Sequence, residues 1–273
     1  MSADRHALYQ RAVQSPEIDV ELFDRVFRRH RKRPPLSLRE DFCGTALLCA
    51  EWAQSDDERV ATGVDRDPEV LAWSRAHVLS ALDEDERERV TLVRGDVRAL
   101  SARTFDIVAA PNFSWAILDD EALHAYLAGA RACLEDDGLL ALEIFGGEDL
   151  ERALVHEHRL DGFTYVWEHA RFDEAQRTLH AAIHFRFEDG SEIANAFRYA
   201  FVLRPFGVLQ SCLRNAGFDR LELQVELPGA RFRERARPPA SAAWTGYLFA
   251  LPVAIASRRQ RRASTPRPTP GPK

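Results

Sequence analysis

Two acidic residues near one glycine turn are the residues whose spacing best predicts chemistry in this sequence. Residues 35–46 read as a buried strand, a tight turn at Gly44 and the start of a helix, with Glu40 near the strand's end. A second strand, residues 59–65, ends in Asp65. This acid follows Gly44 by roughly 20 residues, the spacing at which doubly wound folds hold a ribose. A nucleoside-binding site is therefore the first hypothesis.

The glycine content of this turn narrows the choice of ligand. A dinucleotide site needs the glycines of G-x-G-x-x-G, whereas this turn has only Gly44, with Phe42 and Ala46 at the flanking positions. Over roughly residues 36–256 the sequence resembles the class I S-adenosylmethionine-dependent methyltransferases, and in particular a bacterial subgroup whose first motif is Glu-Asp-Phe-Cys-Gly-Thr. The resemblance implies S-adenosylmethionine as the cofactor.

The resemblance also implies roles for the residues of this motif. Glu40 corresponds to the acid near the amino group of the methionine moiety, and Gly44 and Thr45 would turn backbone N–H groups toward the donor. Arg39 would pair with the methionine carboxylate through its guanidinium fork, with an incidental arginine as the alternative. The donor-binding residues expected from this segment are Arg39, Glu40, Phe42, Cys43, Gly44 and Thr45.

Two further segments are expected to bind the nucleoside. Asp65 follows an apolar strand, where an acid has little structural use but can accept hydrogen bonds from ribose hydroxyls. Arg66 would stack on or flank the adenine. The segment Gly95-Asp96-Val97 resembles the family's third motif, which implies that Asp96 accepts from the adenine amino group and Val97 donates its N–H. A turn cap is the alternative for Asp96.

A loop after the expected strand 105–110 should face the reacting centre, because ligands lie beyond the carboxyl ends of parallel strands. In this loop Asn112 and Ser114 would supply polar contacts, and Phe113 or Trp115 a ring wall; ordinary loop packing is the alternative. Glu143, near the end of another strand, is a weaker candidate.

Alternating apolar runs and helical patterns predict the elements that position these residues. We expect an α/β fold, a doubly wound, seven-stranded, mostly parallel Rossmann-like sheet with a small antiparallel β insertion. The expected segments are an N-terminal helical lid (1–30), a methyltransferase domain (31–256) with the insertion at about 148–204, and a disordered basic, proline-rich tail (257–273). Strands are expected at 36–41, 60–65, 90–95, 105–110, 138–145, 163–172, 178–187, 192–201, 219–226 and 246–255, and helices at 3–30, 46–55, 68–81, 120–135 and 205–216.

The insertion would roof the pocket and supply a general base, if the acceptor needs one. His180 and His184 share one strand face, for which a polar face turned to solvent is the alternative. Tyr165 and His169 share a face of the preceding strand and could form an acceptor pocket. Tyr9, in the opening helix, is a candidate lid residue over the donor.

Composition excludes several other classes. No apolar stretch is long enough to span a bilayer and the start lacks the core of a signal peptide, so we expect a cytoplasmic protein. The four cysteines show no C-x-x-C pairing, so no metal site is expected. The formal net charge is -6, and residues 257–273 contain cations but no acid, so the body is more acidic still. Such a body disfavours nucleic acid as a partner.

The combined prediction is a methyltransferase that acts by in-line displacement on a nitrogen or oxygen of a small molecule. An RNA or protein methyltransferase, a nicotinamide-dependent oxidoreductase and a protein that binds S-adenosylmethionine without turnover are the alternatives. The oligomeric state, monomer or homodimer, stays open.

Overall fold

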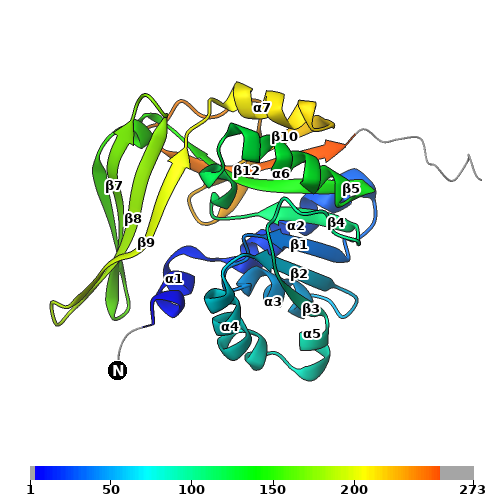
Figure 1. Ribbon diagram of the computed structural model, residues 1–273, viewed down its shortest axis with the longest axis horizontal. Helices are drawn as coiled ribbons and strands as arrows, with labels where there is room; N and C mark the ends of the chain where they lie inside the picture. Colours follow the sequence, from blue (N-terminus) through cyan, green and yellow to red (C-terminus); the bar gives the residue numbers. More distant parts are fainter. Residues whose placement is uncertain (1–3, 253–273) are drawn as a thin grey trace, which may run out of the picture.

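The computed structural model describes residues 4–252. Its centre is an eight-stranded sheet in the order β11-β10-β12-β5-β4-β1-β2-β3 (Figure 1). The strands are β1 (Ser37–Asp41), β2 (Val60–Asp65), β3 (Val90–Arg94), β4 (Phe105–Ala110), β5 (Leu134–Gly146), β10 (Phe218–Leu227), β11 (Arg231–Arg235) and β12 (Trp244–Pro252). Strands β1 to β5 are parallel, while β12 and β10 run antiparallel to their neighbours. The short edge strand β11, which pairs with β10, is the strand beyond the expected seven.

Helices cover both faces of this sheet, which explains why its central strand reads as a continuous apolar run. Every residue of β4 is buried. Ile107 and Ala109 face one core cluster, while Val108 and Ala110 face the other. The helices are α2 (Pro16–Arg31), α3 (Leu47–Gln54), α4 (Pro68–His77), α5 (Glu84–Glu88), α6 (Asp120–Ala132) and α7 (Phe206–Asn215), with short 3-10 turns at Leu79–Ala81, Ser114–Ile117 and Glu148–Glu151.

The N-terminal segment forms two helices where one was expected. Helix α1 (Arg5–Val13) ends before Ser15, because Pro16 disfavours a helical conformation in the residue that precedes it. In α2, Phe23, Val26 and Phe27 are fully buried in the core beneath the sheet. Leu8 of α1 instead packs against the insertion. Only α1 therefore lies apart from the main core.

The insertion is a four-stranded antiparallel sheet in the order β6-β7-β8-β9. Its strands are β6 (Leu154–Leu160), β7 (Phe163–Asp173), β8 (Thr178–Phe187) and β9 (Glu192–Val202). Strand β6 was not expected, whereas the turn between β8 and β9 at Gly190 (φ +83°) was. Figure 1 shows the insertion standing beside the main sheet, with α1 between it and α4. The inward-facing Leu179, Ala181 and Phe201 join the core cluster of the main domain.

Within residues 4–252, no helix combines the length and apolar character needed to cross a bilayer. The expected basic tail lies outside the described residues, as does the end of the expected strand 246–255.

Candidate active site

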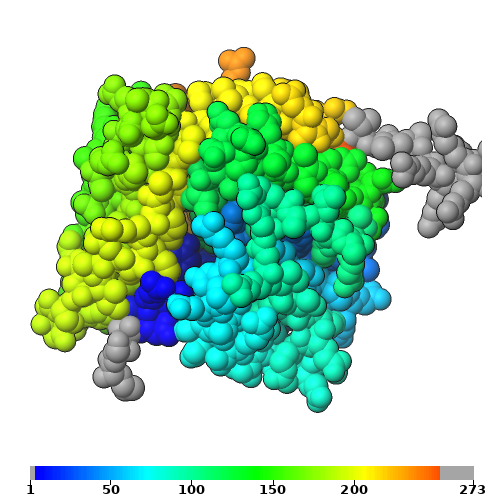
Figure 2. Space-filling view, in the orientation of Figure 1, coloured from blue at the N-terminus to red at the C-terminus, as the bar shows by residue number. Residues whose placement is uncertain are grey.

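The strand order reverses between β1 and β4, and a cavity of about 480 Å³ opens beyond the carboxyl ends of these strands. We call it the cofactor cavity. Figure 2 shows the recess between the insertion, α1 and the region of α4. The expected donor-binding residues that line it are Tyr9, Phe42, Cys43, Gly44, Thr45, Asp65, Arg66, Asp96, Val97, Asn112 and Ser114.

The turn after β1 has the backbone of a glycine-rich loop although it contains one glycine. Phe42, Gly44 and Ala46 have φ values of +57°, +51° and +56°, a region that favours glycine. A Cβ built on Gly44 would meet no atom within 4 Å, so the turn opens to the cavity at this residue. The N–H of Cys43 donates to the carbonyl of Val64 at 3.0 Å, which ties the turn to β2.

Asp65, at the end of β2, joins this turn to the next one. Its Oδ2 accepts the N–H of Gly44 at 2.9 Å, and its Oδ1 accepts the N–H of Asp67 at 2.9 Å. Each carboxylate oxygen can accept a second hydrogen bond, so the group can still receive a ribose hydroxyl. The structure thus brings together the two residues on which the nucleoside hypothesis depended.

The segment after β3 forms another wall of the cofactor cavity. Arg98 donates to both carboxylate oxygens of Asp96, at 2.9 and 2.6 Å, and holds the pKa of that half-exposed carboxyl at about 2. The neighbouring Val97 is buried, and its carbonyl accepts Nη2 of Arg39 at 2.7 Å. Arg66 is exposed at the same cavity. This wall therefore carries fixed charges of both signs.

Two expected donor contacts are corrected by the structure, because β1 is buried on both faces. Arg39 donates to the buried Asp41 at 2.7 Å and to the sulfur of Cys133 at 3.0 Å, so its guanidinium is occupied inside the protein. Glu40, on the other face, accepts the backbone N–H and the thiol of Cys49. Burial raises the pKa of Glu40 to about 8. Neither side chain is part of the cavity lining.

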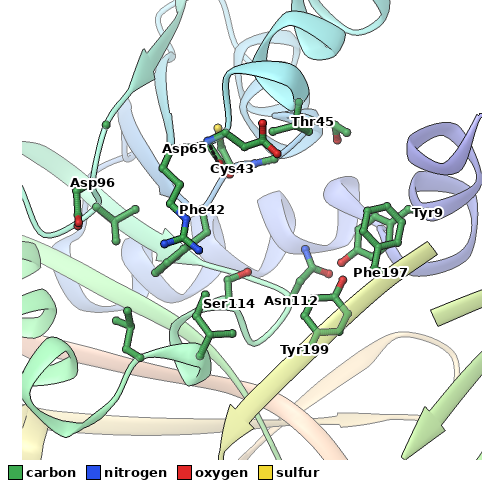
Figure 3. Close-up of a pocket in the computed structure, with 18 of the residues that line it drawn as sticks. Tyr9, Phe42, Cys43, Thr45, Asp65, Asp96, Asn112, Ser114, Phe197 and Tyr199 are labelled. Carbon is green, nitrogen blue, oxygen red and sulfur yellow. Dashed lines mark hydrogen bonds between the residues drawn. The ribbon is translucent and has the colours of Figure 1, made fainter. Parts of the chain in front are cut away.

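Helix α1 closes the cofactor cavity near the glycine turn. Gln10 donates through Nε2 to Oγ1 of the buried Thr45 at 2.9 Å. The preceding residue, Tyr9, points toward Tyr199 and Phe197 of β9, as Figure 3 shows. Burial raises the pKa of the Tyr9 phenol well above its usual value. Tyr9 is therefore a neutral wall residue, in a position consistent with the expected lid.

The loop after β4 separates its polar and aromatic side chains. Asn112 and Phe113 both adopt left-handed backbone angles, and the N–H of Asn112 donates to the half-buried Glu143 of β5. Asn112 and Ser114 line the cofactor cavity (Figure 3), whereas Phe113 turns away and packs on Phe145, with ring centroids 4.4 Å apart. Burial raises the pKa of Glu143 to about 8. Phe113 is thus corrected from a donor contact to a residue of a second cavity.

This second cavity, of about 460 Å³, lies between the main domain and the insertion. We call it the aromatic cavity. Tyr165, Trp167 and His169 of β7 line it, as does Trp244 of β12. It meets the cofactor cavity at three shared residues, which are Tyr9, Asn112 and Tyr199. A molecule in the aromatic cavity would therefore lie next to one in the cofactor cavity.

The three expected histidine bases are not free in the aromatic cavity. His169 lines it, but Nε2 accepts the Trp167 indole N–H at 2.8 Å, Nδ1 faces the Asp149 carbonyl at 3.3 Å, and burial lowers its pKa. His180 and His184 belong to neither lining, because β8 alternates and turns Leu179 inward instead. His184 pairs with Glu168 at 3.0 Å on the outer face. Of the four expected catalytic residues, only Tyr165 has a free polar group at this cavity.

The prediction from the sequence did not include several residues that line the cofactor cavity. Arg5, His6 and Gln14 come from the N-terminal segment, and Phe197 from β9. No motif marks them, because α1 has few apolar residues and reaches the cavity through tertiary contacts with the insertion and the glycine turn. Helical spacing of His6 and Tyr9 is the one signal that could have placed them on a common face.

Comparison with known proteins agrees with this geometry. Residues 42–138 match a family model described as a methyltransferase domain. Among solved structures, an S-adenosylmethionine-bound amino pentose methyltransferase from Micromonospora echinaspora is 18% identical, with a TM-score of 0.66, covering 91% of this chain and 96% of that one. DesVI from Streptomyces venezuelae is 16% identical, with a TM-score of 0.68 and coverage of 93% and 100%.

A third similar structure is a sugar N-methyltransferase from a Streptoalloteichus species, 16% identical, with a TM-score of 0.63 and coverage of 92% and 94%. No curated protein gave a significant match. At these identities the solved structures establish the fold, which is Rossmann-like with a central parallel sheet and added antiparallel strands. Residues 42–138 thus match a methyltransferase domain, which agrees with the expected enzyme class, and two of the similar structures hold S-adenosylmethionine or S-adenosylhomocysteine, the expected cofactor and its product.

Proposed function

We propose that the protein transfers a methyl group from S-adenosylmethionine to an amine nitrogen of a small molecule. The observation that carries this proposal is the meeting of two cavities at Tyr9, Asn112 and Tyr199. One cavity has the polar groups that a charged nucleoside needs, and the other has a mostly apolar lining. Such an arrangement would bring a donor and an acceptor together at one point.

The residues present fit the donor. Gly44 leaves open space where any other residue would place a Cβ, and Asp65 has lone pairs to spare for the ribose. Thr45 and Tyr9 would surround the methionine end, while Asp96 and Val97 would contact the adenine. A volume of about 480 Å³ is within the usual range for sites of this ligand size.

Methyl transfer requires the donor and the acceptor to be aligned and water to be excluded, and it needs no nucleophile from the protein. When bound, the donor would supply an activated methyl carbon on a positive sulfur. The lone pair of the neutral amine would form the C–N bond as the C–S bond breaks, the electrons of that bond would stay on sulfur, and the product would leave with the extra proton as an ammonium ion. The rings of Tyr9 and Tyr199 would exclude bulk water at the junction. The contact of Asn112 with Glu143 fixes the loop beneath it.

A nitrogen acceptor is supported by the similar structures described above, whose names include a sugar N-methyltransferase and an amino pentose methyltransferase. A small acceptor is also supported by the acidic body of the chain, which does not suit RNA. The single glycine of the turn disfavours a dinucleotide and hence an oxidoreductase.

Titration calorimetry and label transfer test this function. We expect S-adenosylmethionine to bind and NAD not to bind. The label of methyl-labelled S-adenosylmethionine should then enter a pool of small amines, with none in RNA or protein supplied in parallel. Label found only in a polymer, or in hydroxyl compounds alone, would contradict the proposal.

A further inference from the structure

We infer the class of acceptor from the aromatic cavity: an amine carried on a flat, apolar ring system, rather than on a hydroxyl-rich sugar. This inference rests on the proposed function, because it takes the aromatic cavity as the acceptor site. It sets this chain apart from the sugar methyltransferases that share its fold.

The first observation is a continuous wall of rings. Ring centroids of Phe145 and Phe201 lie 5.5 Å apart, those of Phe201 and Tyr199 lie 5.0 Å apart and nearly parallel, and those of Tyr199 and Trp167 lie 6.0 Å apart. Phe113 extends the wall beside Phe145. Centroid spacings of this size allow offset-stacked and edge-to-face contacts, which a planar guest could continue.

The second observation is the absence of charge. Among the described residues, the lining of the aromatic cavity contains no Asp, Glu, Lys or Arg. The cofactor cavity, by contrast, includes Asp65, Arg66, Asp96 and Arg98. A guest in the aromatic cavity therefore meets rings and none of the carboxylates or guanidinium groups that line the cofactor cavity.

Three of the neutral polar side chains in this lining are already bonded within the protein. The Trp167 indole N–H is used by His169, whose other nitrogen faces the carbonyl of Asp149. The hydroxyl of Thr245 donates to Glu226 at 2.6 Å. A sugar in this cavity would lose hydrogen bonds to water and could not replace them at these three side chains, which is unfavourable for each hydroxyl left unpaired.

Among the other polar groups, which include the Tyr165 hydroxyl within the aromatic cavity, three lie at the junction with the cofactor cavity. Tyr9, Tyr199 and the side chain of Asn112 belong to both linings, and burial raises the pKa of Tyr199 to about 12. These neutral groups can hold one amine by hydrogen bonds at the point where the methyl group arrives. The ring body of the acceptor would then extend into the aromatic cavity, whose volume of about 460 Å³ suits a molecule of that size.

Two primary amines of similar size test the inference: 2-phenylethylamine and glucosamine. Donor binding is measured first by calorimetry, and formation of S-adenosylhomocysteine is then followed with each amine. We expect kcat/KM for 2-phenylethylamine to exceed that for glucosamine by about tenfold or more, a difference of about 1.4 kcal/mol. If the donor binds and glucosamine is the equal or better acceptor, or neither amine reacts, the inference is overturned. If the donor fails to bind, the proposed function fails with it.

A matched pair of variants on β7 locates the effect. Trp167→Leu removes a ring from the cavity wall, whereas Phe172→Leu removes a ring from the same strand outside both linings. We expect Trp167→Leu to raise KM for 2-phenylethylamine by about tenfold, with donor affinity unchanged, and Phe172→Leu to leave KM unchanged. Should Trp167→Leu lose donor binding through misfolding, Phe145→Leu, at the other end of the wall of rings, replaces it. Equal KM values for wall and control variants would overturn the inference.

Discussion

The cofactor cavity and the aromatic cavity share three residues but are built in different ways. The first is made mainly by short segments at the ends of β1 to β4, is closed by α1 and β9, and contains charges, among them Asp65 and Asp96. The second is assembled from residues as far apart as Tyr9 and Thr245, and its described lining contains no Asp, Glu, Lys or Arg. Local, polar construction suits a donor common to many enzymes, while an inserted sheet can reshape the acceptor side without disturbing the donor side.

The largest expected effect breaks a charge pair under the cofactor cavity. Arg39→Met leaves Asp41 buried without its partner, so we expect the free energy of unfolding to fall by about 3–5 kcal/mol. Chemical denaturation measures this loss. Arg98→Met, which breaks the exposed pair with Asp96, is the control and should cost at most about 1 kcal/mol. Equal losses in the two variants would show that the buried pair has no special importance.

A second change separates donor binding from acceptor binding. Asp65→Ala should weaken S-adenosylmethionine binding by about 1–3 kcal/mol, because ribose hydroxyls and the turn at Gly44 lose an acceptor. Titration calorimetry gives the affinity, with the exposed Asp57→Ala as a control. Unchanged affinity in Asp65→Ala would remove Asp65 from the site.

A third prediction concerns pH, since the cofactor side contains buried carboxyls. Burial, opposed by two bonds from Cys49, raises the pKa of Glu40 from 4.5 to about 8, so the folded state holds a proton that the unfolded state releases. Stability from this proton is present below pH 4.5 and is lost as pH rises toward 8. In the wild type, Glu40 should lower the free energy of unfolding by about 1.4 kcal/mol for each pH unit in this range. Glu40→Gln should lack this contribution, so its free energy of unfolding should fall less steeply with pH.

Tyr165→Phe, in the aromatic cavity, is the control for this measurement. Because a tyrosine does not titrate in this window, the variant should keep the pH dependence of the wild type. A Glu40→Gln protein with the wild-type pH profile would mean that Glu40 is ionised in the folded state.

The smallest expected effect comes from a substitution at Ala46, in the turn after β1. Ala46→Gly removes the strain of a left-handed backbone, which should stabilise the protein by about 1–2 kcal/mol. It also removes a buried methyl group, which should destabilise the protein by about 0.8 kcal/mol. We expect the unfolding free energy to stay level or rise by less than about 1 kcal/mol. Ala50→Gly, equally buried within α3, should lower it by about 1–2 kcal/mol. Similar losses in both would contradict the strain at Ala46.

The sequence predicted the donor side of the fold well, because its strands are short, are followed by acids or turns, and in β2 and β4 are mostly apolar. It missed β6 and β11, whose polar sequences, such as Arg231–Arg235, show no apolar alternation. These are edge strands, held by pairing with one neighbour and not by burial. Strand β5 also begins earlier than expected, through the polar residues 135–137, with an irregular register against β4.

Side-chain direction was the main part of the site that the sequence did not determine. In β1 both faces are buried, so the pattern could not tell that Arg39 and Glu40 turn into the core and not toward the donor. The aromatic cavity was less predictable still, because its walls meet only through tertiary packing. Its rings look like core residues in any one segment, and it was the position of the insertion that left a space between them.

Helix α1 has a consequence for the way in which the two ligands affect each other. Tyr9 lines both cavities, while its neighbours Leu8 and Gln10 bind the insertion and the glycine turn. Whichever molecule enters first orders a ring that the other must also touch. If the acceptor changes the affinity for the donor by some factor, the donor must change the affinity for the acceptor by the same factor. Nine residues of helix would thus make the two halves of the active centre cooperative.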